Sequence, residues 1–124
     1  MPSQMQLRMT VETAIEQFRE AAISKGDFVS DSSRDHALHS QMAEAVSFLK
    51  SHDDLAIQAF RSLLHDENNH VRLWVASFFT CRDDAEAMEV LAKLGLLNDM
   101  VGFAARMTID QYVAGILQPP FKLL

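Results

Sequence analysis

The histidines are the residues of this chain that could bind a metal ion if their spacing brought them together. His36 and His39 stand three positions apart with Asp35 beside them, a spacing that on a helix points two imidazoles toward one ion. Two histidines are too few for a site. The remaining histidines stand at the ends of predicted helices: His52, His65 and His70. Because helix ends favour histidine through hydrogen bonds and the helix dipole, we predict solvated or capping histidines, with no metal and no cofactor.

Cys81 and two aspartate pairs are the other side chains that could do chemistry. Cys81 follows a strongly apolar segment, and a helix C-terminus does not lower the pKa of a thiol. Arg82 is adjacent and could help a thiolate, but we predict a small buried apolar residue. The pairs at 53–54 and 83–84 each precede a predicted helix, where carboxylates cap free amides. The sequence also has no Gly-rich phosphate loop and no Ser-His-Asp order, so we predict that the protein is not an enzyme.

Composition indicates one globular domain over residues 1–124. The chain is 48% hydrophobic and 23% charged, and its four Gly and three Pro are too few for the many turns of a sandwich or barrel. The net charge of −6 opposes a broad phosphate-binding surface, so we predict no nucleic-acid partner. With one cysteine, no apolar leader and no run of 18 apolar residues, we expect a cytoplasmic protein without a membrane partner.

Apolar residues recur every three or four positions in several segments, so about six helices are expected. The predicted helices cover residues 10–26, 33–51, 54–65, 71–79, 83–95 and 108–117. The segment 71–79 is the most apolar and should lie at the centre of the core, with Trp74 packed inside. The stretch 95–106 is interrupted by Asn98, Asp99 and Gly102, and is predicted to be a packed loop.

Local signals predict where these helices begin and end. Thr10 should cap the first helix, and Asp83 with Glu86 predicts a capped start for the fifth. Gly95 would close the fifth helix in a left-handed turn. Thr108 with Gln111 forms a capping box for the last helix.

The passage 59–79, A-F-R-S-L-L-H-D-E-N-N-H-V-R-L-W-V-A-S-F-F, resembles the core of a HEAT repeat. The residues at matching positions are Leu63, Leu64, Asp66, Val71, Arg72 and Ala76. The turn departs from the pattern, because 68–70 is Asn-Asn-His where a proline often stands. The segments 9–12 and 102–117 are also similar to an uncharacterised bacterial family of small HEAT-like proteins, which brings no known activity. The resemblance implies an all-α, right-handed stack of helix hairpins.

Stacked helix hairpins commonly present a surface to a partner, so we predict a protein-interaction module. The candidate contact residues lie in the turn of the HEAT-like passage: Glu67, Asn68 and His70. The acidic composition favours a basic protein or peptide. One alternative is self-assembly, with the apolar residues 121–124 docking on a neighbouring copy, and another is a toxin-neutralising immunity protein. A nucleic-acid or damaged-base reader ranks lowest, because only Arg61, Arg72, Arg82 and scattered lysines could supply its cationic stripe.

Overall fold

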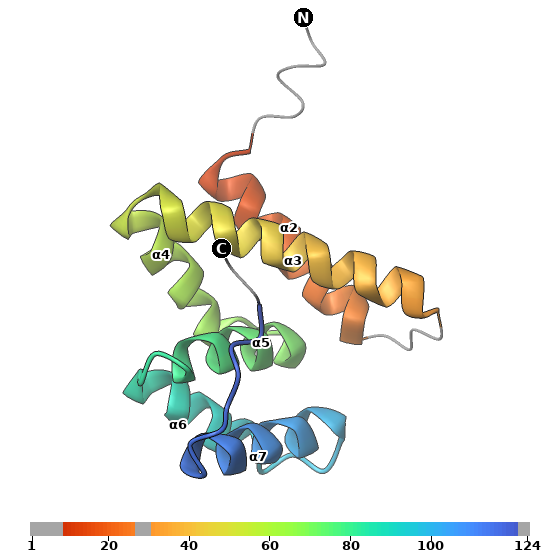
Figure 1. Ribbon diagram of the computed structural model, residues 1–124, viewed down its shortest axis with the longest axis vertical. Coiled ribbons are helices and arrows are strands. Elements are labelled where there is room, and N and C mark those ends of the chain that lie inside the picture. Colours follow the sequence, from red (N-terminus) through yellow and green to blue (C-terminus); the bar gives the residue numbers. More distant parts are fainter. Residues whose placement is uncertain (1–8, 27–30, 122–124) are drawn as a thin grey trace, which may run out of the picture.

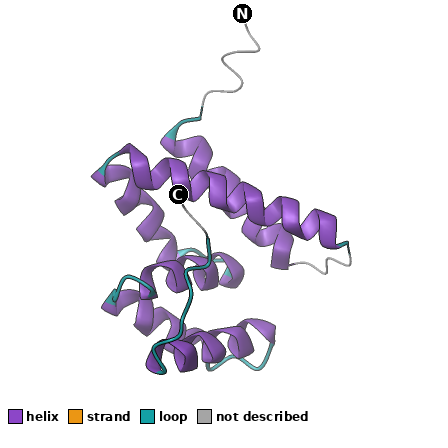
Figure 2. Ribbon diagram, viewed as in Figure 1, coloured by secondary structure: helices purple, strands orange, loops and turns teal. Residues whose placement is uncertain are grey.

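Helices make up most of the described part of the chain, and the prediction of an all-α fold is confirmed. The computed structural model describes residues 9–26 and 31–121 (Figure 1). No β-strand occurs within these two ranges (Figure 2). The elements are α2 (Val11–Gly26), α3 (Ser32–His52), α4 (Asp54–Arg61), the short 3-10 helix η1 (Ser62–His65), α5 (Asn69–Thr80), α6 (Ala85–Leu94) and α7 (Met100–Val113).

Successive helices pack on one another from one end of the molecule to the other. Helix α2 lies along α3 at one end, and α5, α6 and α7 follow in order toward the other end (Figure 1). Helix α4 and η1 connect the two groups, and α2 also contacts α5. The segment after α7 then runs back past α5 toward α3, so the last described residues lie near the first helices (Figure 1).

Aromatic rings from separate helices meet in the core. Phe18 of α2 contacts Phe60 of α4 edge to face, with ring centroids 4.9 Å apart. Phe60 also contacts Phe78 and Phe79 of α5. Because such ring pairs add to the free energy gained by burial, this cluster fixes α2, α4 and α5 against each other. The position of α5 confirms that the segment 71–79 lies at the centre of the core.

Short polar side chains cap most of the helices, largely as predicted. Thr10 Oγ1 accepts from the backbone N–H of Thr13 ahead of α2, and Asp53 Oδ1 accepts from the N–H of Ala56 in α4. Helix α6 is capped by Asp84, whose Oδ1 accepts from the N–H of Ala87. Asp83, which we predicted as the cap, instead turns the chain with a φ of 61° and accepts a hydrogen bond from the Tyr112 hydroxyl.

The prediction of a packed loop at 95–106 is correct only for residues 95–99, and the helix predicted at 108–117 is the second half of a longer helix that ends four residues earlier. Helix α7 begins at Met100 and ends at Val113. Asp99 does not interrupt this helix but caps it, since its Oδ1 accepts from the N–H of Gly102. Gly102 is needed for close packing, because a Cβ there would overlap the backbone carbonyl of Leu97.

Two predictions of where helices begin or end in this region are also wrong. Thr108 lies inside α7 and donates its hydroxyl to the Ala104 carbonyl, so it forms no capping box with Gln111. Gly95 has a right-handed φ of −62°. The left-handed glycine is Gly115, with a φ of 76°, and it follows α7.

The segment after α7 is fixed to the body of the molecule by Phe121. The side chain of Phe121 is only 2% exposed and its ring packs against Trp74, Phe78 and Phe18. The prediction that residues 121–124 dock on a neighbouring copy is therefore wrong for Phe121, which lies in the core of its own chain. Residues 122–124 lie outside the described residues.

The described helices were also compared with the length and hydropathy that a bilayer requires. None of them is both long enough and apolar enough to cross a membrane.

Candidate binding surfaces

The turn of the HEAT-like passage is held by one aspartate. Asp66 Oδ2 accepts from the backbone N–H of Asn68, and both carboxylate oxygens accept from the Arg19 guanidinium of α2 at 2.7 and 3.1 Å. Burial alone would raise the pKa of Asp66, but the hydrogen bonds from Arg19 and Asn68 outweigh it and hold the pKa below its usual range. Asp66 thus stabilises the turn and also ties it to α2.

The three predicted contact residues have different surroundings. Glu67 is exposed. Asn68 caps α5, because its Oδ1 accepts from the backbone N–H groups of His70 and Val71. His70 is partly buried and its imidazole lies against Gly26, where a Cβ would overlap the ring. Asn68 and His70 therefore have structural contacts, and Glu67 is the one of the three whose side chain faces solvent freely.

The predicted hairpin residues occupy core positions. The buried members of the set are Leu63, Leu64, Val71 and Ala76. Arg72 is partly buried and its guanidinium contacts the Asn69 side chain. The burial of these residues agrees with the two neighbouring helices predicted at 54–65 and 71–79.

The structure does not bring the histidines together. His36 is exposed, whereas the His39 ring packs against both Trp74 and Phe121, with centroid distances of 5.7 and 5.2 Å. Burial lowers the pKa of His39, with the nearby Lys25 acting in the same direction. His65 pairs with Glu86 at 2.8 Å. Across residues 9–26 and 31–121, no three side chains of His, Cys, Asp or Glu gather as metal ligands would.

Cys81 is partly buried beside the segment that follows α7. Its Sγ lies 3.6 Å from the backbone carbonyl of Gln118. Burial raises the pKa of the thiol, although the charge of Arg82 opposes the shift. The surroundings of Cys81 therefore favour the protonated, unreactive form of the thiol.

The three arginines considered for a nucleic-acid surface are engaged separately. Arg61 binds both carboxylate oxygens of Asp84 at 2.7 and 2.9 Å and also pairs with Glu86. Arg82 lies over the Phe78 ring, 4.8 Å from its centroid. With Arg72 packed against Asn69, these residues do not form a continuous cationic stripe.

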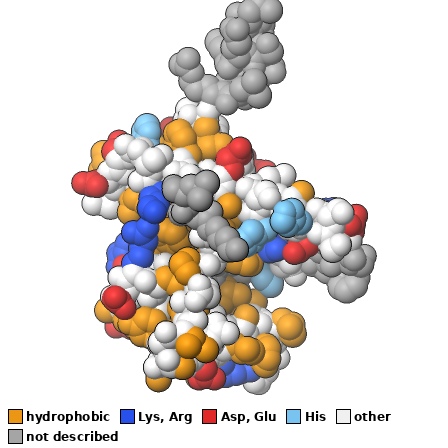
Figure 3. Space-filling model, viewed as in Figure 1, with side chains coloured by type: hydrophobic (Ala, Val, Ile, Leu, Met, Phe, Trp, Pro, Cys, Tyr) orange, Lys and Arg blue, Asp and Glu red, His pale blue; other side chains and the backbone are white. Residues whose placement is uncertain are grey.

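An apolar stripe is exposed on α7, the last described helix. Met100, Phe103 and Met107 are 74%, 50% and 43% exposed, and their spacing places them on one side of the helix. Leu96 is exposed just before the helix begins. Among the described residues, every exposed large hydrophobic side chain except Leu55 lies between 96 and 116. Figure 3 shows hydrophobic side chains gathered over α6 and α7 at the lower end of the view.

We define the α7 stripe as Leu96, Met100, Phe103 and Met107. The opposite side of the same helix is buried against the body through Val101 and Ala105, with Ile109 partly buried. The stripe is therefore additional apolar surface that the fold leaves uncovered within the described residues. The stripe was not expected from the sequence because the last helix was predicted to begin at 108, after most of these residues. The recurrence of Val101, Ala105 and Ile109 at intervals of four was the available signal.

Comparison with known proteins gives no match to this chain. No protein-family model, no curated protein and no solved structure is significantly similar to it.

Proposed function

We propose that this chain is a HEAT-like, non-enzymatic module that binds a partner protein through the α7 stripe. The hairpin motif at 63–76 supports the HEAT-like part, because its matching apolar residues are buried between successive helices. In a stack of helix hairpins, the outer face of the terminal helix must either be polar or be covered. The single observation that carries the proposal is that this outer face is apolar on α7.

The residue types of the stripe and of its rim favour a protein partner. Exposed apolar patches with polar rims are typical of protein interaction sites. Two methionines give the stripe flexible, polarisable side chains that adapt to a partner surface. The rim includes the exposed carboxylates of Asp99 and Asp110. We therefore expect the partner to present an apolar ridge flanked by Lys or Arg, in agreement with the acidic composition of the chain.

A second copy of this chain is the other candidate partner. A face at the end of a stack can pair with itself about a two-fold axis, and the exposed stripe provides a surface for such pairing. Self-association would then use the α7 stripe and not the C-terminal residues, because Phe121 is buried in its own chain.

Site-specific photo-crosslinking in the cells that make the protein tests the proposal. A photoreactive phenylalanine replaces Phe103 in one variant and Leu55 in a control variant. Leu55 is the matched control, since it is also a large apolar residue and even more exposed, 74% against 50% for Phe103, but lies on α4, away from α7. We expect a discrete protein adduct at position 103 and none at position 55.

The mass of the adduct separates the candidates. An adduct that contains one copy of this chain and one other protein supports the proposal, whereas an adduct of two copies supports self-association. Absence of an adduct at position 103, or equal adducts at both positions, would show that the α7 stripe is not a docking site.

A further inference from the structure

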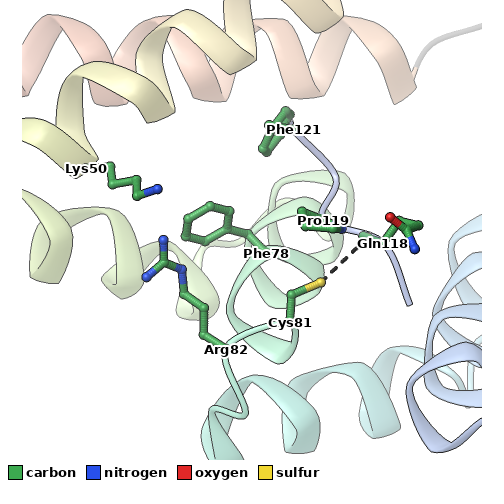
Figure 4. Close-up of a pocket in the computed structure, with 7 residues that line it drawn as sticks. All are labelled: Lys50, Phe78, Cys81, Arg82, Gln118, Pro119 and Phe121. Carbon is green, nitrogen blue, oxygen red and sulfur yellow. Dashed lines mark hydrogen bonds between the residues drawn. The ribbon is translucent and has the colours of Figure 1, made fainter. Parts of the chain in front are cut away.

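A second feature, distant from the α7 stripe, is a cavity beneath the segment that follows α7. Its volume is about 710 Å³, within the range of small-molecule sites in proteins. Figure 4 shows that its walls come from three parts of the chain: Lys50 near the end of α3, residues 78–82 at the end of α5, and residues 118–121.

The walls of the cavity are apolar on one side and cationic on the other. Pro119 supplies exposed apolar surface, and the rings of Phe78 and Phe121, only 4% and 2% exposed, border the cavity. Lys50 and Arg82 project into the same opening, with the Arg82 guanidinium over the Phe78 ring (Figure 4). Neither cation has an ion-pair partner among the described residues.

The charge of this cavity runs against that of the whole chain. The net charge is −6, yet the described residues that line the cavity include two cations and no carboxylate. By contrast, both Arg19 and Arg61 pair with aspartates. Two cations without a carboxylate partner in the described ranges, placed beside aromatic rings, are complementary to an anion that carries an apolar body.

We propose that this cavity binds a small organic acid. Its carboxylate lies between the Lys50 ammonium and the Arg82 guanidinium, and its hydrocarbon body packs on Pro119 beside Phe78. The site requires the segment after α7, because Pro119 and Phe121 form one wall only when Phe121 is docked in the core. The proposal does not depend on the α7 stripe, and either can fail without the other.

Titration of the purified full chain with three probes at neutral pH and low salt tests the proposal. The probes are phenylacetate, the uncharged phenethyl alcohol, and acetate, which has the charge without the ring. Calorimetry gives the affinity, and NMR amide shifts locate the binding. We expect saturable binding of phenylacetate, with shifts at Lys50, Phe78 and Arg82. The alcohol and acetate should each bind at least about tenfold more weakly, because each lacks one of the two interactions.

Variants separate the cavity from general charge attraction. Lys50→Gln and Arg82→Gln should each weaken phenylacetate binding about tenfold, the size expected for one charge-assisted hydrogen bond. Arg34→Gln is the control, because Arg34 is an exposed cation of α3 outside the cavity and its loss removes the same charge. We expect less than about a twofold change for this control. Thermal melting confirms that each variant is folded.

Four results would overturn the proposal. They are no saturable binding, shifts outside the cavity, equal binding of phenylacetate and the alcohol, and equal weakening by Arg34→Gln. A fifth result, acetate binding as tightly as phenylacetate, would show that the cavity is a simple anion site and would overturn its assignment to an acid with an apolar body.

Discussion

Replacing Phe121 with alanine should destabilise the whole domain, although this residue lies outside every helix. The ring is buried against Phe18, Trp74 and Phe78, which come from two helices. Removal of a buried Phe side chain costs about 3–5 kcal/mol of the free energy of unfolding. We expect a value near the lower end, about 3 kcal/mol, because the terminal segment can lift away and relax part of the cavity left by the substitution.

Urea denaturation followed by circular dichroism measures this loss. Phe121→Leu keeps most of the apolar volume but loses the ring contacts, so it should cost only about 1–1.5 kcal/mol. Ile116→Ala is the control on the same segment, because Ile116 is exposed and its removal should change the stability by less than about 0.5 kcal/mol.

Trp74 reports the docking of the segment directly. It is the only tryptophan of the chain, and its ring stacks on Phe121 with centroids 5.7 Å apart. In Phe121→Ala, emission of the native state should shift to longer wavelength as Trp74 becomes exposed. Unchanged emission together with a loss of stability below about 0.5 kcal/mol would refute the reasoning and would remove one wall of the proposed acid-binding cavity.

Three further predictions concern the body of the domain. Asp84→Asn keeps the helix cap but loses the charge that binds Arg61, whose hydrogen bonds hold the pKa of Asp84 below its usual value. It should therefore cost about 1 kcal/mol of the free energy of unfolding at neutral pH. Urea titrations should show this difference shrink below the ordinary pKa of an aspartate and disappear as the pH falls through the lowered pKa of Asp84. Gly102→Ala should lower the free energy of unfolding by about 2 kcal/mol, because its Cβ overlaps the Leu97 carbonyl; a neutral effect on thermal melting would mean that α7 packs less closely there. Thr80→Val should stabilise the fold by up to about 1 kcal/mol, because the buried Thr80 hydroxyl has no hydrogen-bond partner among the described residues; a loss of stability on denaturation would indicate that the hydroxyl is bonded.

Local sequence signals predicted most helices well, because their causes are local. The apolar repeat of residues 71–79 and the Leu63-Leu64 pair gave a hairpin that the structure contains. Thr10 and Asp53 cap helices as their positions indicated. In these segments, side-chain spacing and capping chemistry alone determine where the helix lies.

The errors occur where a distant contact or a neighbouring residue decides between local alternatives. Gly102 predicts a break in the helix when it is considered alone, but it is required by the close approach of the Leu97 carbonyl. Asp83 and Asp84 are equally good caps in the sequence, and the chain reversal at Asp83 leaves Asp84 in the capping position. Neither outcome follows from local propensity.

The sequence predicted the candidate sites less well than it predicted the fold. Lys50 and Arg82 face one cavity only because the segment after α7 returns across the molecule, and nothing near Phe121 in the sequence encodes that return. The turn residues Glu67, Asn68 and His70 were identified from the HEAT-like pattern, but two of them are used for capping and packing. The α7 stripe could be recognised only after the helix had been located.

The most direct test of the central proposal is whether a partner covers the α7 stripe in the cell. Carbene footprinting, read by mass spectrometry, compares labelling of the chain in intact cells with labelling of the dilute purified chain. The account predicts that the peptide containing Met100, Phe103 and Met107 is labelled severalfold less in cells, while the peptide containing Leu55 is labelled equally in both. Equal labelling of the α7 peptide in the two samples would contradict it.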